Sequence, residues 1–504
     1  MQNLEPMALV SSCSGVNTPI PKRFARCLMK LGKTKFIKSK GVQMKRGVIL
    51  LSVVTALSLP AFADESGLEA QVEDLEKQLK SLQKKVKSNN KKASQARTMA
   101  NGNHLKFDVD FRTTMDSIEY KFGNGETAKN SSLLADRLLI NMKYDAGDKV
   151  RFYGTAAFNK AFGQTLNSQP NNMNHKFDWV TNEALADDGI KLKEAYWLYS
   201  NKTFFGTDVA WTASIGRRPS VDGLGANFRE GQKPKSAIAS TVNVQFDGAS
   251  FKWNTDKITP LTGSWFKLCL GRGLTSAKPR FSNDGQDYAE DDKSVNSNMV
   301  GMIFVPYDNG QYSLYTNFAK SKDMIGFDEN PSEGFKNFGD LDLATVMFKA
   351  DGLGDGVSDF LDDTLLFASY SQSKTHPKNG RAMLGSNDSE TGNSFWVGVQ
   401  MPDVITDDAR WGVEYNKGSK YWRSVTYGED TMIGSKIAAR GDAKEIYWIK
   451  PLTKSLSMSA RYTKIDYDYT GSNAFFGLGG TPNAIGDNDV KEAEDFRLLF
   501  RYKY

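Results

Sequence analysis

Most of the chain alternates apolar and polar residues at every second position. The pattern begins near residue 104 and continues to residue 504. Because successive side chains of a β-strand point to opposite faces, a period of two predicts strands with one apolar and one polar face. In the first of these strands, one face carries Phe107, Val109, Phe111, Thr113 and Met115, and the other carries Lys106, Asp108, Asp110, Arg112 and Thr114.

The last residues of the chain form the clearest strand. In a transmembrane barrel the last strand must pair with the first, so that no backbone edge faces lipid. A strand that ends on an aromatic residue also resembles the outer-membrane assembly signal, so we expect the barrel-assembly machinery to bind it. An ordinary edge strand is the alternative. The apolar face of this strand consists of Phe496, Leu498, Phe500, Tyr502 and Tyr504.

Tight turns and long polar loops join the strands in alternation, as they do in outer-membrane barrels. Strands of 9–11 residues with such connections take about 25 residues each. The span 104–504 therefore predicts an all-β fold, a transmembrane antiparallel β-barrel of about 16 strands. The tight turns lie at 145–148, 306–310 and 450–454, and the long hydrophilic segments are 159–190, 219–240, 274–297, 321–341, 376–393 and 471–493.

Ahead of the barrel the apolar period is 3.5 residues, which predicts a short coiled coil over 64–90 and a polar linker over 91–103. A seam of about three heptads rarely holds as an isolated helix, so we expect a periplasmic stalk that joins subunits into a homodimer or homotrimer. A single amphipathic helix packed elsewhere is the alternative. The seam consists of Leu68, Val72, Leu75, Leu79, Leu82 and Val86.

Residues 44–63 predict a signal peptide. Met44 is followed by two basic residues, an apolar run and the small pair Ala61 and Ala63, so we expect cleavage before Asp64. A short buried helix is the alternative. Residues 1–43 precede this start and are interpreted as a non-native upstream extension.

The net charge and the cysteine count are interpreted differently once the predicted leader is excluded. The net charge is +6, but residues 1–63 contain ten Lys and Arg residues and one acidic residue, which leaves 55 basic and 58 acidic residues in 64–504. A nucleic-acid partner is therefore not predicted. Only Cys269 remains after the leader, so no disulfide forms within one mature subunit. No run of 18 apolar residues exists, which excludes a helical membrane protein.

The sequence offers little for catalysis or metal binding. His104, His175 and His376 are far apart, and no G-x-S-x-G motif is present. Residues 351–359 are similar to a calcium loop, but Leu353 occupies a position that needs an oxygen ligand. We therefore predict no enzyme activity, no cofactor and no metal site.

One group of basic residues follows a strand and continues into a Gly-rich loop. If that loop folds into the barrel, the cations form a constriction that favours small anions. If it lies outside, they are surface charge. The group consists of Arg217, Arg218, Arg229, Lys233 and Lys235.

Three segments, 214–220, 363–371 and 411–422, resemble an uncharacterised family of bacterial outer-membrane β-barrel proteins of porin-like type, domain of unknown function 3373. The likeness extends over nearly the whole mature chain. It implies a fold and a location but no activity.

These observations predict a porin-like channel in the bacterial outer membrane, surrounded by lipid, with its stalk in the periplasm. Ions and small hydrophilic solutes would diffuse through it passively. The alternative is a plugged structural or adhesive barrel whose long external loops bind a surface or a partner. An outer-membrane hydrolase is a third interpretation.

Overall fold

The structure is a computed structural model that describes residue 82 and most of residues 105–504. The chain divides into two units, Met1–Lys92 and Ala93–Tyr504, and every described strand belongs to the second. The predicted signal peptide, coiled coil and linker lie outside the described residues, apart from Leu82, which is helical and exposed. After residue 104 the positions left out are 148, 165–183, 219–221, 236, 276, 278–287, 289–294, 329–334, 355, 379, 428 and 478.

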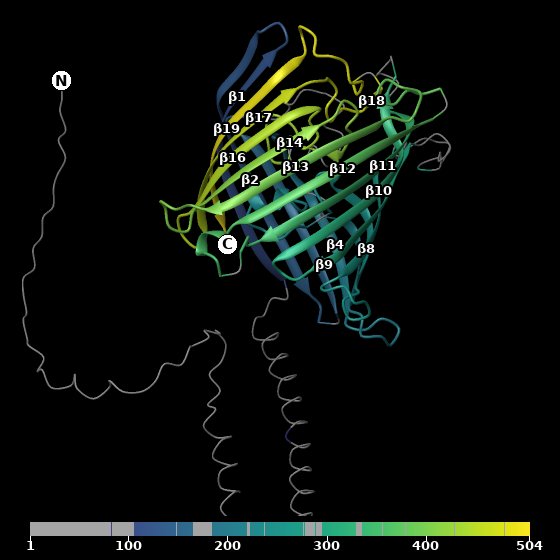
Figure 1. The fold of residues 1–504 in the computed structure, drawn as a ribbon, viewed down its shortest axis with the longest axis vertical. Helices are drawn as coiled ribbons and strands as arrows, with labels where there is room; N and C mark the ends of the chain where they lie inside the picture. The colour runs from purple at the N-terminus through teal and green to yellow at the C-terminus, as the bar shows by residue number, and fades with distance from the viewer. Residues whose placement is uncertain are drawn as a thin grey trace, which may run out of the picture. The chain divides into compact units, whose positions relative to one another are not determined.

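Sixteen antiparallel strands form a closed ring (Figure 1), which confirms the predicted fold class and strand number. Among the described residues no helix has the length and hydrophobicity that a membrane crossing requires. The strands of the wall are β1 (Leu105–Phe122), β2 (Thr127–Asp145), β3 (Val150–Ala161), β4 (Ala186–Asn201), β5 (Trp211–Arg218), β7 (Phe246–Asn254), β8 (Trp265–Thr275), β9 (Asn296–Asp308), β10 (Tyr312–Phe327), β11 (Lys336–Asp351), β12 (Leu365–Pro377), β13 (Thr391–Pro402), β14 (Arg410–Gly418), β16 (Gly441–Pro451), β17 (Leu456–Tyr467) and β19 (Val490–Lys503). The connections contain β6 (Val242–Asn243), β15 (Val425–Thr426), β18 (Phe476–Gly477), α4 (Ala226–Arg229) and α5 (Asp359–Asp362).

The ring closes where β19 pairs with β1. Val109 and Tyr504 exchange two backbone hydrogen bonds of 2.9 Å, and the pairing runs on to Phe122 and Val490. Closure leaves neither terminal strand with an open edge, as the sequence predicts for a barrel.

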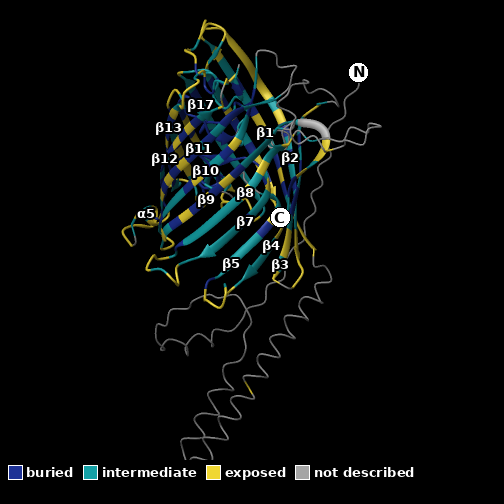
Figure 2. Ribbon diagram, turned by 90° about the vertical axis from the view of Figure 1, so that its right-hand side faces the viewer, coloured by how far each residue is buried: buried dark blue, intermediate teal, exposed yellow. Residues whose placement is uncertain are grey.

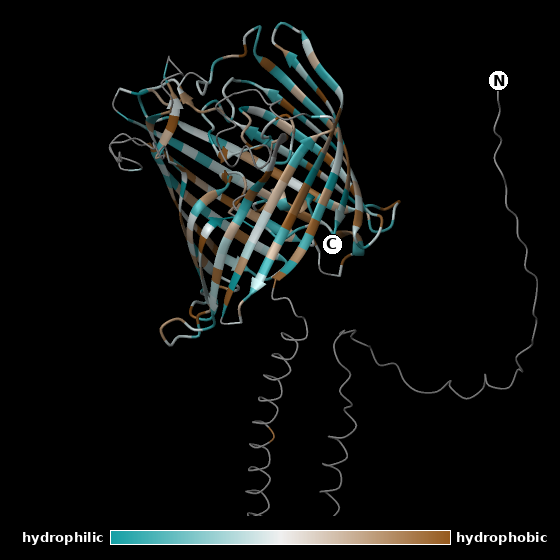
Figure 3. Cartoon of the chain, turned by 180° about the vertical axis from the view of Figure 1, so that it is seen from behind, coloured by the Kyte–Doolittle hydropathy of each residue, from teal (hydrophilic) through white to brown (hydrophobic). Residues whose placement is uncertain are grey.

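Alternation along each strand separates an outer from an inner face. In β19, Phe496, Phe500 and Tyr502 are 46%, 43% and 43% exposed, whereas Arg497 and Arg501 are 1% and 7% exposed. Figure 2 shows the same alternation of buried and exposed positions along β12 and β13, and Figure 3 shows brown hydrophobic and teal hydrophilic segments following one another along the strands. The outer face of β19 is therefore apolar near its C-terminal end.

The connections differ in length at the two ends of the barrel. Tight turns such as 146–149, 309–311 and 452–455 define the short-turn end, where β1 begins and β19 ends. Most of the long connections lie at the other end, the long-loop end, where 123–126 and 328–335 are the shortest, whereas the longest connection at the short-turn end is 352–364. This asymmetry agrees with the sequence prediction.

Several strands extend further towards the long-loop end than predicted. β10 and β11 occupy most of 321–341, so the predicted loop there is wrong over most of its length, and β12 includes His376. The outer face of these extensions is polar, which hides the alternation. His376 Nε2 lies 2.8 Å from Asp342 Oδ2, and Lys320 Nζ lies 3.3 Å from Asp342 Oδ1.

Two long connections fold back inside the ring, and we call them the inner loops. They are the β5–β7 loop, residues 222–245, and the β14–β16 loop, residues 419–440. Ile238 and Ala239 of the first and Ile437 of the second are at most 1% exposed and contact wall side chains that point inward. β6 and β15 pair in parallel and join the two loops.

Candidate functional site

The inner face of the barrel divides into three sectors with different chemistry. We call β9–β13 the apolar sector, β16, β17, β19, β1 and β2 the charged sector, and β3–β8 the open sector. Strand β14 separates the first two. The inner loops contact the sectors in different ways, and this arrangement decides which part of the lumen is filled.

The apolar sector is covered by the β5–β7 loop. Ile238 and Ala239 of the loop pack with the inward Met347, Phe367 and Trp396, all buried to 1% exposure or less. Burying side chains of this size stabilises the contact by about 1.5–3 kcal/mol each. The hydrophobic core of the protein therefore lies inside the ring, between this loop and the wall.

One glycine allows this close packing. Gly225 has a φ of +100°, and a Cβ at this position would lie 2.4 Å from the Trp396 ring. A larger residue would push the loop away from the wall and strain its backbone.

The charged sector gathers four arginines around one carboxylate of the β14–β16 loop. Asp430 accepts hydrogen bonds of 2.5 and 2.6 Å from the two Nη atoms of Arg112. Its carboxylate also lies 3.5 Å from Arg497, 3.7 Å from Arg137 and 3.9 Å from Arg461. Burial alone would raise the pKa of Asp430, but the charges of Arg112, Arg497 and Arg137 hold it well below its ordinary value.

The β5–β7 loop reaches the charged sector as well. Arg229 Nη1 donates to Glu445 Oε1 at 2.7 Å, and Lys436 Nζ donates to the same oxygen at 2.6 Å. The carboxylate of Glu230 accepts a hydrogen bond from Arg501. This loop thus contacts both the apolar and the charged sector across the inside of the ring.

The open sector carries cations without acidic partners. The Arg218 guanidinium lies 4.2 Å from the ring centroid of Tyr196, and Lys252 Nζ lies 4.1 Å from that of Trp265. Within the described part of the chain, no carboxylate lies at ion-pair distance from Arg218, Lys252 or Lys267. These side chains are half-buried and line the lumen, so they give this sector a positive potential.

Cavities at the short-turn end are also basic. One, of 520 Å³, is lined by Lys149, Lys202 and Lys252. Another, of 320 Å³, is lined by Arg229 and Arg410 together with arginines of the charged sector. Both would attract anions towards the lumen.

The structure places the five predicted constriction residues in different surroundings. Arg217 shares the outer strand face of Ile215 and pairs with Asp247 at 3.1 Å, whereas Arg218 faces the lumen. Arg229 is buried at the bridge, and Lys233 is exposed. Lys235 pairs with Glu194 at 2.9 Å.

The sequence interpretation missed the β14–β16 loop and the acidic residues at the centre of the lumen. A signal was present, because Ile433, Ile437 and their neighbours make this connection more apolar than an external loop should be. Asp430 and Glu445 gave no such signal, since their arginine partners are distant in sequence. Among the described residues, no group of three or more His, Cys, Asp or Glu side chains could hold a metal ion.

Comparisons with known proteins give a family and no function. A family model described as a protein of unknown function, DUF3373, matches residues 127–504, which confirms the resemblance drawn from the sequence. No curated protein matches the chain.

Three porins are among the solved structures that are similar. OprB of Pseudomonas putida has 13% identity and a TM-score of 0.45, with 81% of this chain and 96% of that chain covered. OmpF of Salmonella typhi in complex with daunomycin has 10% identity and a TM-score of 0.44, with 80% and 98% covered. An anion-selective porin from Comamonas acidovorans has 12% identity and a TM-score of 0.43, with 79% and 99% covered. These TM-scores are too low to carry an argument, so the architecture rests on the strand pairing of the chain itself.

Proposed function

Since the chain belongs to the DUF3373 family of proteins of unknown function, we propose from its lumen that it is an outer-membrane channel. Small anions and other hydrophilic solutes would diffuse through it passively. The apolar outer face and the closed ring support a lipid location, because only a barrel without edges satisfies its backbone within a bilayer.

The observation that carries this proposal is the uncompensated charge of the open sector. Arg218 and Lys267 line a cavity of 70 Å³ together with Ala237 and Val242 of the β5–β7 loop, and Lys252 lines the 520 Å³ cavity at the short-turn end. A row of cations on one side of a water-filled passage concentrates anions and repels cations. The lumen would therefore prefer chloride to potassium.

Reversal potentials in planar bilayers with a KCl gradient test the proposal. We expect anion preference in the native protein and its loss in the triple variant Arg218→Gln, Lys252→Gln, Lys267→Gln. Arg217→Gln is the matched control, because it removes an arginine next to Arg218 that faces outward and should leave selectivity unchanged. Cation preference in the native protein, unaltered in the triple variant, would refute the proposal.

A plugged structural or adhesive barrel is the second candidate, and the two inner loops favour it because they fill much of the lumen. Single-channel conductance separates the two. A protein that inserts into bilayers without current steps would be a plugged barrel, and its long loops would become the functional surface.

The remaining sequence predictions stay proposals. We propose that residues 64–90 join subunits in the periplasm and that the outward aromatic face of β19 is recognised during barrel assembly. Removing 64–90 and measuring the oligomer mass in detergent tests the first. Replacing Phe500 and Tyr502 with serine and measuring membrane insertion tests the second.

A further inference from the structure

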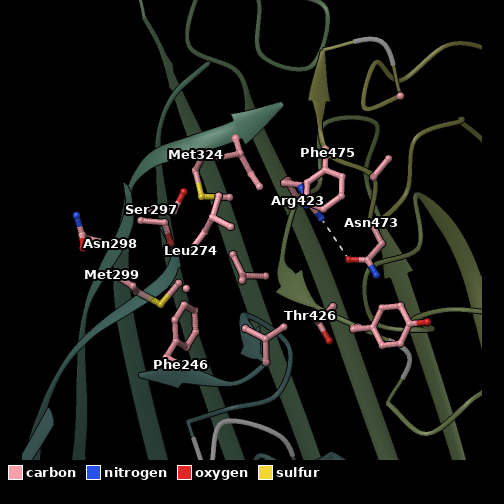
Figure 4. A pocket seen from close by; sticks show the side chains of 18 of the residues that line it. Phe246, Leu274, Ser297, Asn298, Met299, Met324, Arg423, Thr426, Asn473 and Phe475 are labelled. Atoms are coloured by element: carbon pink, nitrogen blue, oxygen red, sulfur yellow. Dashed lines mark hydrogen bonds between the residues drawn. The ribbon is translucent and has the colours of Figure 1, made fainter. Parts of the chain in front are cut away.

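A separate cavity of 410 Å³ lies at the long-loop end of the barrel (Figure 4). Residues of β8, β9 and β10 form one side, and segments 423–427 and 473–475 form the other. Its volume lies within the range of about 300–1,000 Å³ that is usual for small-molecule sites. None of the residues predicted from the sequence to form a constriction lines it.

The walls of this cavity are mainly apolar. Figure 4 shows Phe246, Leu274, Met299, Met324 and Phe475 around the space. Aromatic rings and thioethers of this kind pack well against flat or flexible apolar groups. An occupant should therefore have an apolar body.

Among the described residues, Arg423 is the single charged residue that lines the cavity. The residue is 7% exposed, and its Nη1 donates to Asn473 Oδ1 at 3.3 Å, the contact drawn as a dashed line in Figure 4. Its Nε makes no hydrogen bond, and no carboxylate of the described residues lies at ion-pair distance. The guanidinium therefore has unused donors beside an apolar space.

Arg440 adds a second positive charge nearby. Its guanidinium donates only to backbone carbonyls, those of Trp422, Thr470 and Gly480. Burial lowers the pKa of Arg423 to about 10, and burial together with the charge of Arg423 lowers the pKa of Arg440 to about 9. Both remain protonated at neutral pH, and buried cations without a counter-ion are costly.

We propose that this cavity binds a small monocarboxylate with an apolar body. The carboxylate accepts hydrogen bonds from the guanidinium of Arg423, whose planar fork matches two carboxylate oxygens. The apolar body fills the space between Met299, Met324 and Phe475. Ser297 and Thr426 also line the cavity, but their hydroxyl groups already donate to Asp323 O and to Glu429 Oε1, which leaves Arg423 as the donor for the carboxylate.

A simpler ligand would complement only one of the two features of the cavity, either the charge of Arg423 or the apolar walls. An inorganic anion would pair with Arg423 and leave the apolar walls in contact with water. A neutral apolar molecule would fill the walls and leave the guanidinium without a partner. The combination of one cation and an apolar lining selects the two-part ligand.

Isothermal titration calorimetry of the full chain in detergent, with benzoate as the probe, tests this proposal. We expect Arg423→Met to weaken benzoate binding about tenfold to a hundredfold, the usual effect of losing hydrogen bonds to a charged group. Arg423→Lys should weaken it less, because it keeps the charge. Lys420→Gln, an exposed cation in the same loop, is the matched control and should leave affinity unchanged.

A second variant tests the apolar part while keeping the charge. Ala474→Trp fills the cavity and should also abolish benzoate binding, and benzamide should bind the native protein at least about tenfold more weakly than benzoate. If Arg423 were only structural, Arg423→Met would lower the melting temperature; a binding residue predicts an unchanged or higher one.

Two results would overturn the proposal: benzoate affinity unaffected by both Arg423→Met and Ala474→Trp, or benzamide bound as tightly as benzoate. The calorimetry needs no open passage. A barrel without conductance that still binds benzoate would refute the channel and leave this site intact.

Discussion

The apolar and charged sectors lie on the same ring of strands and hold the inner loops by opposite means. In the apolar sector, Ile238 packs against Met347 and Trp396. In the charged sector, Arg229 pairs with Glu445, and Asp430 is surrounded by arginines. The first contact is non-directional and insensitive to salt and pH, whereas the second depends on geometry and ionisation.

The difference shows what fixes each face of the wall. Lipid contact demands apolar side chains on the outside of every strand within the membrane, so the outer alternation there follows the same pattern from strand to strand. The inner face has no such common requirement. The type of residue at each inward position depends on which segment of the chain packs against it. Leu341 and Leu343 point inward because the inner loops cover them, not because the lumen is dry throughout.

The largest effect should come from a substitution that disrupts the packing of the β5–β7 loop against the apolar sector. Ile238 is 1% exposed, and losing its packing costs about 2–5 kcal/mol, before the cost of burying a carboxylate is added. In Ile238→Asp a loss of about 4 kcal/mol would shift the β5–β7 loop about a thousandfold towards release. We expect larger single-channel conductance and new protease cleavage within 222–245.

Ile258→Asp is the control for that variant. Ile258 is 61% exposed in a turn at the short-turn end and contacts neither inner loop. Equal conductance changes in both variants would show that the apolar sector does not hold the loop.

The next effect concerns the charged sector. In Asp430→Asn, Arg112, Arg137, Arg461 and Arg497 lose their shared counter-ion, and breaking a buried pair of this kind costs about 3–5 kcal/mol. We expect faster hydrogen–deuterium exchange in 429–440 and a shift of reversal potential towards anions. Asp388→Asn, an exposed acid in another loop, should show neither change.

Lowering the pH should weaken the contacts of the charged sector and leave those of the apolar sector unchanged, without any mutation. The pKa of Asp430 lies well below 3.8, so its contribution to stability is complete above that value and is lost as the pH falls through the lower, folded value. Against the effect of burial, the charge of Arg501 likewise lowers the pKa of Glu230. We expect constant conductance from pH 7 to about pH 4 and a rise below it.

Asp430→Asn supplies the control for the acid response. If Asp430 is the main titrating group, this variant should lose most of the rise at low pH. A rise of full size in the variant would assign the response to other carboxylates.

The smallest effect lies where the two sectors meet. Trp396 ends the apolar sector, and its Nε1 donates to Glu414 Oε2 at 3.0 Å, while Lys436 donates to the same oxygen at 2.6 Å. Trp396→Phe removes one of these bonds, which should cost about 1 kcal/mol, and its smaller ring leaves a cavity beside Gly225 that adds to this cost. A slightly lower melting temperature with unchanged selectivity is expected, and a large change in selectivity would show that the sectors are coupled through Glu414.

The fold was predictable because its main requirement is repeated in every strand. Positions such as Phe500 and Tyr502 must face lipid, and each repeats the same period of two. The prediction was wrong where this requirement ends. At the long-loop end, outward residues such as Asp342 and His376 are polar, and the ends of β11 and β12 were therefore predicted to be loops.

The candidate site was predictable only in part. The β5–β7 loop was identified from its basic residues, but the inward direction of Arg218 and the outward direction of Arg217 depend on the register of β5, which composition does not contain. The partnership of Arg112 with Asp430 joins residues far apart in sequence. No local pattern encodes such a pair, so only the folded ring could reveal it.

The seam between β19 and β1 has a consequence for biogenesis. β19 follows every other wall strand in the sequence, yet it supplies Arg497 and Arg501, which add to the ion pairs that Asp430 makes with Arg112 and Glu230 makes with Arg229. A nascent barrel inserted strand by strand therefore carries both inner loops before these anchors are in place. Pairing of β19 with β1 and formation of these ion pairs therefore occur in the same step. A barrel that has not yet closed lacks part of the contacts that hold its inner loops in place.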